Sequence, residues 1–217
     1  MKCERASEQV RTQAINLALE SAISRQRLEK YLAANGDDLD LALRLYERNL
    51  RLSEAFYVPL QSLEVCLRNI AHNQMSATYG PDWLTDQVAA PLNDFSRSMV
   101  NEAVREIDGA ATAGKIVAEL KFAFWVGLMS HQYDNTLWRS AMHRCFRSSG
   151  SKKRAVVHGR LNAIRRFRNR VAHHEPIFHK RLDVTHGEVI EALGWMCRDT
   201  QAWTAHLSRV PEVLNSN

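Results

Sequence analysis

The chain lacks any long apolar run. No stretch approaches the ~18 consecutive apolar residues that cross a bilayer, so no membrane-spanning helix and no membrane partner are expected. The first residues, MKCERASEQVRTQ, are charged and have no apolar centre, which argues against a secretory signal peptide. We therefore expect a cytoplasmic protein. Hydrophobic residues make up 45% of the 217 residues, which is enough for a sizeable core.

Cysteine is scarce, and no motif for a metal or a cofactor is present. The four cysteines form no CxxC pair, and scattered cysteines are more often buried thiols than disulfides or zinc ligands. They are Cys3, Cys66, Cys145 and Cys197. Several potential zinc ligands lie close together in sequence but without HExxH spacing: His173, His174, Glu175, His179 and His186. No Gly-rich phosphate loop or GxSxG motif occurs, so neither a metal site nor a cofactor is expected.

Strand signals are nearly absent, because no segment alternates cleanly with β-branched enrichment. Helical patterns dominate, and no linker or internal repeat divides the chain. We therefore expect an all-α protein with one domain over residues 1–217. Residues 1–36 would form a small N-terminal helical appendage, and residues from about 37 to 210 a helical bundle. Ser24 is expected to cap a short helix that ends at Gly36.

The bundle helices are predicted from caps, apolar spacing and breakers. Asp38 or Asp40 would begin a helix with Leu39, Leu43, Tyr46 and Leu50 on one face, and Pro59 should kink or break it before the pattern resumes to Tyr79. Asn93 or Asp94 opens the next helix. Residues 115–129 should form one buried helix, and HQYDN and RSSGSKK should be loops.

Two further helices are predicted near the C-terminus. One runs from about Lys152 to His173 or His174 and must end before Pro176. Its apolar stripe is Val156, Val157, Leu161, Ile164, Phe167 and Val171. The other spans residues 185–207, with Val189, Ala192, Leu193, Met196 and Trp203 facing inward.

Acidic residues are almost missing from one segment. Residues 1–60 hold nine basic and nine acidic side chains, whereas residues 144–181 hold twelve basic side chains and a single acid, Glu175, for a net charge of +11. Positive charge of this density attracts a polyanion if it lies on one surface, which points to nucleic acid. The alternatives are a solvated helix face, or arginines neutralised by acids elsewhere in the fold.

The segment RNRVAHHEPIF, from Arg168 to Phe178, contains the candidate catalytic residues. Asn169 and His173, four apart, share a helix face, while Arg168 lies about 140° round the helix from His173. Arginine fits phosphate oxygens, histidine exchanges protons near neutral pH, and asparagine orients a neighbour by hydrogen bonding. Together they suit metal-free cleavage of RNA by its own 2′-hydroxyl. The alternative to a catalytic role is a structural one, in which Arg168 forms a salt bridge and the histidines interact favourably with the negative end of the helix dipole.

A second polar constellation lies earlier, in LEVCLRNIAHNQM. Glu64, Arg68 and His72 follow at i, i+4 and i+8, so Glu64 and Arg68 are placed for an ion pair within one helix. We expect this pair to have a structural role or to support the active site, rather than to take part directly in catalysis.

The motif and several other stretches resemble a known family. RNRVAHH matches the RNxxxH form of the motif of HEPN domains, and the chain resembles their Abi-like, abortive-infection branch. The stretches SRQRLEKYL, ALRLYERNLRLSEAF, LEVCLRNIAHNQM, YGPDWL and KIVAELKFAFWVGL support that branch and occur in the family's order. They cover residues 24 to 180 together with the motif.

The resemblance implies an up-and-down HEPN-type bundle with additional helices. It also implies a homodimer whose two motifs meet in a basic cleft, and a metal-independent endoribonuclease used as a toxin or in phage defence. The catalytic residues would be Arg168, Asn169 and His173, supported by Glu64, Arg68 and His174. The residues expected to follow the RNA backbone are Arg165, Arg166, Arg170 and Lys180.

Other interpretations stay open. The first alternative to an enzyme is a non-catalytic RNA-binding module held by a regulatory RNA. The second is a protein-interaction component of a defence system. An RNA or protein antitoxin is a further possible partner that the resemblance suggests.

Overall fold

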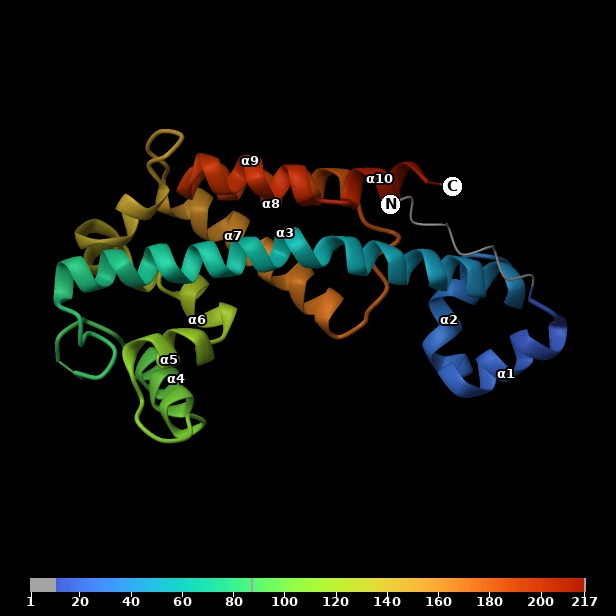
Figure 1. The fold of residues 1–217 in the computed structure, drawn as a ribbon, viewed down its shortest axis with the longest axis horizontal. Helices are drawn as coiled ribbons and strands as arrows, with labels where there is room; N and C mark the ends of the chain where they lie inside the picture. Colours follow the sequence, from blue (N-terminus) through green and yellow to red (C-terminus); the bar gives the residue numbers. More distant parts are fainter. Residues whose placement is uncertain (1–10, 87, 217) are drawn as a thin grey trace, which may run out of the picture.

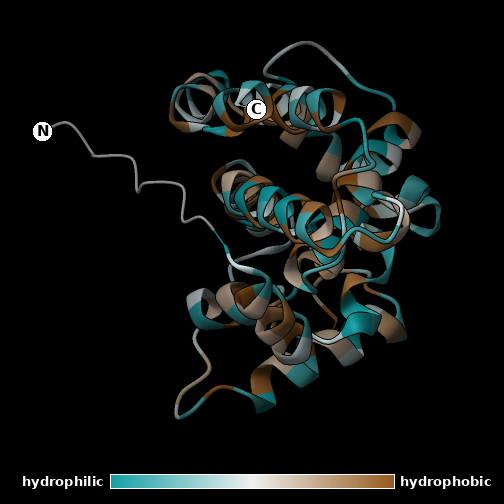
Figure 2. Cartoon of the chain, turned by 90° about the vertical axis from the view of Figure 1, so that its right-hand side faces the viewer, coloured by the Kyte–Doolittle hydropathy of each residue, from teal (hydrophilic) through white to brown (hydrophobic). Residues whose placement is uncertain are grey.

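The structure, a computed structural model, describes residues 11–86 and 88–216. Every regular element in these residues is a helix, so the predicted all-α class is confirmed. Cys3 and most of the segment MKCERASEQVRTQ lie outside the described residues. The helices are arranged around one long helix, α3, with α8, α9 and α10 on one side of it and α1 and α2 on the other (Figures 1 and 2).

Helix α3 (Leu39–Tyr79) has 41 residues and forms the axis of the fold (Figure 1). Asp38 begins it as predicted, because its side chain accepts a hydrogen bond from the Leu41 amide at 3.0 Å. Pro59 was predicted to kink or break this helix; a break is wrong, since the helix continues through Pro59 to Tyr79. Proline removes one helical hydrogen bond, but Pro59 is buried, and the packing of α8, α9 and α10 against α3 offsets that loss.

Helices α1 (Gln13–Ile23) and α2 (Arg25–Ala33) form the N-terminal appendage at one end of α3 (Figure 1). Ser24 caps α2 as predicted, since its hydroxyl accepts from the Arg27 amide at 3.3 Å. The appendage has a small hydrophobic core of its own, which it shares with the first turns of α3. This small core consists of Leu28, Tyr31, Leu32, Ala42 and Leu43.

Helices α7 (Arg154–Ala172), α8 (Leu182–Met196), α9 (Arg198–Leu207) and α10 (Val210–Asn215) pack against α3 and one another. The single helix predicted over residues 185–207 is wrong. Cys197 adopts an extended conformation and separates α8 from α9, which turns back along α8. A Cβ atom on Gly194 would lie 2.5 Å from the side chain of Gln201, so glycine permits this close approach. Trp203, predicted to face inward, is 59% exposed after this reversal.

The remaining helices cover the other end of α3. They are α4 (Asp94–Arg105), α5 (Ala113–Glu119), α6 (Phe122–Gly127), and the short turns η1 (His131–Tyr133), η2 (Asp134–Trp138) and η3 (Met142–Phe146). Asn93 caps α4 as predicted. The single buried helix predicted over 115–129 is wrong, because Leu120 and Lys121 are extended between α5 and α6. After this break, Phe124 stacks on Trp83 in the main core, and Trp125 packs edge-on against both rings.

Two smaller predictions are also corrected. HQYDN, predicted as a loop, lies in the turns η1 and η2, whereas most of RSSGSKK is a loop as expected. In α7 the predicted apolar stripe is buried at Val157, Leu161, Ile164 and Phe167, but Val156 is 50% exposed. Val156 stands in the first turn of α7. The main core otherwise extends from Leu52 on α3 to Val213 on α10.

Candidate functional site

The C-terminal end of α7 carries the RNRVAHH motif and is closed by a Schellman motif. The Glu175 amide donates to the Arg170 carbonyl at 2.8 Å, and the His174 amide donates to the Val171 carbonyl at 3.0 Å. His174 takes the left-handed position of this motif, with φ of 57°. His173 is the C-cap residue and its amide donates to the Asn169 carbonyl at 2.9 Å. The predicted helix end before Pro176 is therefore confirmed.

Arg168 faces α3 and forms an ion pair there. Its Nε lies 3.3 Å from Oε2 of Glu64, and both side chains are partly exposed. The sequence predicted that Glu64 would pair with Arg68, its neighbour one turn along the same helix. The structure pairs Glu64 with Arg168 instead, because the two residues meet across the contact between α3 and α7. Such a half-exposed pair contributes only about 0–1 kcal/mol to stability, so its value lies in holding Arg168 in place.

A groove of about 670 Å³ runs between α3 and the end of α7, and Arg168 is part of its wall. It is lined by Leu50, Ser53, Glu54, Tyr57, Leu60, Gln61, Glu64, Val65, Arg68, Arg168, Val171, Ala172 and His174. Leu50, predicted on one face of this helix with Leu43, is 46% exposed here, and Tyr57 is 64% exposed. The buried Nε of Arg68 has no hydrogen-bond partner among the described residues. The groove thus joins an apolar wall to the guanidinium groups of Arg68 and Arg168, of which Arg168 pairs with Glu64.

The structure places only some of the predicted site residues together. Arg168, Glu64, Arg68 and His174 line the groove, whereas Asn169 and His173 are not among its lining residues. His173 is exposed, as expected for a side chain about 140° round the helix from Arg168. One chain therefore presents the arginine and the histidine of the motif in different directions.

Ion pairs neutralise part of the +11 segment, as one of the alternatives anticipated. Five arginines have acidic partners: Arg154 with Asp134, Arg160 with Glu188 and Glu191, Arg168 with Glu64, Arg170 with Glu175, and Arg181 with Asp183. In residues 11–86 and 88–216 no such ion pair is formed by Arg165, Arg166 or Lys180. Arg165 instead donates to Asn162 Oδ1 at 3.1 and 3.0 Å, and Arg166 is exposed. Of the predicted RNA-binding residues, Arg170 is thus engaged with an acid and the other three keep uncompensated charge.

The histidines after the motif disperse in the fold. His179 is exposed, whereas His186 is half-buried and lies 2.9 Å from the Ser208 hydroxyl, and burial lowers the pKa of both. Among the described residues, no three His, Cys, Asp or Glu side chains gather as metal ligands. Cys66, Cys145 and Cys197 are free thiols, and only Cys145 is fully buried. The part of the chain that the structure describes also has no helix long and apolar enough to cross a membrane.

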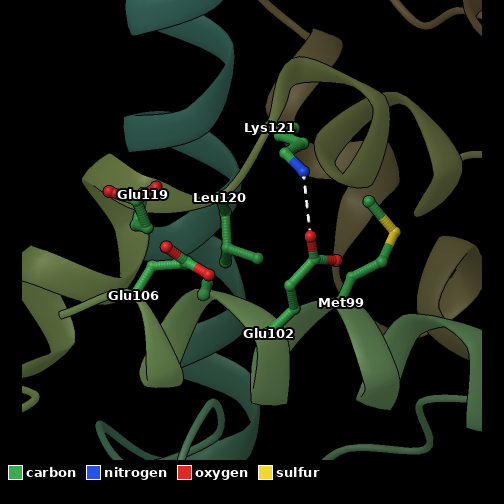
Figure 3. Close-up of a pocket in the computed structure, with 7 residues that line it drawn as sticks. Met99, Glu102, Glu106, Glu119, Leu120 and Lys121 are labelled. Atoms are coloured by element: carbon green, nitrogen blue, oxygen red, sulfur yellow. Dashed lines mark hydrogen bonds and ion pairs between the residues drawn. The ribbon is translucent and has the colours of Figure 1, made fainter.

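A second hollow lies between α4 and the α5–α6 junction, far from the motif in sequence. It is only about 20 Å³ in volume, and Lys121 Nζ lies 3.0 Å from Glu102 Oε1 at its edge (Figure 3). Glu106 and Glu119 are the other charged side chains around it. A hollow that admits hardly one water molecule offers no room for a substrate.

Sequence reasoning missed several residues around the motif. These residues are Tyr57, Asn49 and Arg27, and none of them belongs to the motif. Each lies more than 100 residues from Arg168 along the sequence, so only the fold brings them near the end of α7. Comparison of the chain with protein-family models, with curated proteins and with solved structures finds no match in any of the three.

Proposed function

We propose that this protein is a metal-independent endoribonuclease of the HEPN type, acting as a toxin or as an abortive-infection effector. One observation carries the proposal: the motif arginine, Arg168, lies in a groove with Arg68, while His173 stands free at the exposed end of the same helix. Two neighbouring guanidinium groups suit a phosphate, and an exposed histidine suits proton transfer.

The reaction needs only groups that the chain supplies. His173 accepts the proton of an RNA 2′-hydroxyl, and the oxygen then attacks the adjacent phosphorus. The bond from phosphorus to the 5′-oxygen breaks, and that oxygen takes a proton from water. The products are a 2′,3′-cyclic phosphate and a 5′-hydroxyl end. Arg168 stabilises the charge that develops on the phosphate, and Asn169 orients the phosphate or the histidine. Arg165, Arg166 and Lys180 hold the RNA backbone, with Arg170 available when it releases Glu175.

The angle between Arg168 and His173 favours a homodimer. Because one chain turns these residues about 140° apart, a second copy that docks on the groove would supply the missing histidine. The groove suits such docking, since Leu50 and Tyr57 expose apolar surface along α3 next to Arg168. The site is then shared between two subunits.

Cleavage of labelled RNA in the presence of EDTA tests the enzyme. We expect the wild type to cleave and His173→Ala and Arg168→Ala to lose at least about a hundredfold in rate, the scale of a lost proton-transfer group. His206→Ala is the matched control, because His206 is an exposed histidine in the last turn of α9. Cleavage by His173→Ala at the wild-type rate refutes the proposal.

Mixing the two inactive variants tests the shared site. A heterodimer of Arg168→Ala and His173→Ala would keep one intact site of two, so an equal mixture should recover about a quarter of the wild-type activity. A site contained in one chain predicts no recovery. The mass of the particle in analytical ultracentrifugation should correspond to two chains.

A non-catalytic RNA-binding module is the second candidate. It is favoured by Arg165 and Arg166, whose charge is free for a polyanion whatever the role of His173. It predicts RNA that purifies with the protein, salt-sensitive binding, and no effect of His173→Ala on affinity. An RNA or protein antitoxin would inhibit the protein, whether it is the nuclease or the RNA-binding module. If charge reversal at Arg165 and Arg166 leaves the biological effect intact, both RNA functions fail and a protein-interaction component remains.

A further inference from the structure

The five residues that follow the motif histidine, His174–Phe178, are held at several points of their backbone. The Schellman hydrogen bonds fix His174 and Glu175, and Glu175 also pairs with Arg170 at 3.1 Å. Pro176 and Ile177 are buried. The direction in which the chain leaves α7 is therefore set by contacts on both sides of His173.

Asn49 on α3 provides the most enclosed of these contacts. Its Oδ1 accepts hydrogen bonds from the Ile177 amide at 2.7 Å and from the Phe178 amide at 3.2 Å. Asn49 is only 2% exposed, and it is one of very few polar residues buried among the described ones. A buried asparagine in a helix is costly unless its polar atoms are bonded, so its hydrogen bonds to this segment explain the choice of residue.

Helix α2 of the appendage provides the other contacts. Arg27 donates a hydrogen bond from its guanidinium to the His174 carbonyl. The ring of Phe178 packs on the ring of Tyr31 with centroids 5.1 Å apart, and Tyr31 in turn packs on Tyr46 of α3 at 5.2 Å. Phe178 thus packs against the small N-terminal core, whereas Ile177 belongs to the main core.

We infer that Asn49 is a positioning residue for His173. Together with Arg27 it forms a clamp, which consists of the hydrogen bonds that hold the backbone of residues 174–178 against α2 and α3. The carbonyl of His174 and the amides of Ile177 and Phe178 are tied to α2 and α3, so His173 stands at the end of a segment fixed on both sides. The inference rests on the proposed function for the role of His173, but the clamp itself is testable without RNA. Misplacement of a catalytic group by about 1 Å costs up to a hundredfold in rate, so loss of the clamp should lower turnover.

The experiment compares Asn49→Ala, Asn49→Asp and Arg27→Ala with Asn73→Ala in the full chain. Asn73 is an exposed asparagine on the same helix and serves as the matched control. Asn49→Asp keeps an oxygen that accepts both amides, so it should rescue what Asn49→Ala loses. Arg27→Ala removes only a surface contact, which keeps the test valid if Asn49→Ala fails to fold.

The first readout is the imidazole resonance of His173 by NMR, with His206 as internal reference. We expect Asn49→Ala and Arg27→Ala to shift or broaden the His173 signal and to speed amide exchange at residues 174–178, while His206 and Asn73→Ala show no change. An unaltered His173 signal in a folded Asn49→Ala protein overturns the inference, whether or not the wild type cleaves RNA.

The second readout is steady-state cleavage of RNA. A positioning role predicts that Asn49→Ala lowers kcat about tenfold or more while KM stays within about twofold, with recovery in Asn49→Asp. A changed His173 signal with an unchanged kcat also overturns the inference and leaves the proposed function standing. Absence of cleavage in the wild type defeats the proposed function alone, because the NMR result still decides whether the clamp exists.

Discussion

His174 occupies a backbone position that disfavours its own side chain. Its φ of 57° lies in the left-handed region, and it takes the place in the Schellman motif where glycine is most common. The replacement His174→Gly should therefore stabilise the protein.

The magnitude follows from two opposing terms. The left-handed conformation costs an L-residue roughly 1–2 kcal/mol, because Cβ approaches the following carbonyl oxygen. Glycine avoids this cost but loses about 0.5–1 kcal/mol in backbone entropy on folding. The net gain for His174→Gly is about 0.5–1 kcal/mol. In a protein of this size it corresponds to a Tm about 1–4 °C higher.

Urea and thermal unfolding provide the assay, with His174→Ala as the paired variant. Alanine keeps the left-handed strain, so it should stay within about 0.5 kcal/mol of the wild type. Asp37→Gly, at another non-glycine residue with positive φ (63°), should also stabilise. Ala163→Gly, inside α7, should destabilise by about 1 kcal/mol. If His174→Gly is no more stable than His174→Ala, the left-handed helix end is not as described.

Three other outcomes follow from burial and hydrogen bonding. Burial raises the pKa of Tyr31 to about 12, and its hydroxyl has no hydrogen-bond partner among the described residues. Tyr31→Phe should therefore leave the free energy of unfolding in urea unchanged or raise it by up to about 1 kcal/mol. Tyr31→Ala should lower it by about 3–5 kcal/mol, because it also removes the buried ring. Hydrogen bonds from Thr200 lower the pKa of the Cys197 thiol, while burial raises the pKa of Cys145 to about 12, so mass spectrometry after iodoacetamide treatment at pH 7.5 should find Cys197 alkylated long before Cys145. Burial lowers the pKa of His186 in the folded state, so on acidification the unfolded chain takes up this proton first, and the free energy of unfolding should fall as the pH drops below about 6.5. His186→Gln should make the free energy of unfolding, measured in urea, depend less on pH in this range. An equally steep pH dependence in the variant would contradict the lowered pKa of His186.

Helix starts could be predicted from the sequence because capping is local chemistry. Ser24, Asp38 and Asn93 each accept a hydrogen bond from an amide three residues ahead, within the same short segment that the sequence displays. The Pro176 stop was equally predictable. The all-α class follows from the same periodicity and caps.

Breaks inside apolar segments could not be predicted, because they depend on distant packing. Lys121 and Cys197 are ordinary residues for a helix interior, yet the chain turns there to place α5–α6 and α8–α9 against α3. Pro59 is the converse case, since local chemistry predicted a break that burial among other helices overrides.

The candidate site was predictable only as a motif. Spacing singled out Arg168, Asn169 and His173 and gave their angle round the helix. The partner of Glu64, the groove beside Tyr57 and the buried bonds of Asn49 join residues on different helices, and no pattern in one sequence connects them.

The two hydrophobic cores can form at different stages of synthesis, because they draw on different lengths of chain. All the buried residues of the small core lie between Leu28 and Leu43, so this core can close as soon as α1, α2 and the start of α3 have left the ribosome. The main core joins Leu52 to Val213 and must wait for nearly the whole chain. Phe178 therefore packs against a small core whose own residues were synthesised long before it. A nascent chain thus carries the small core, on which Phe178 packs, long before it carries the RNRVAHH motif.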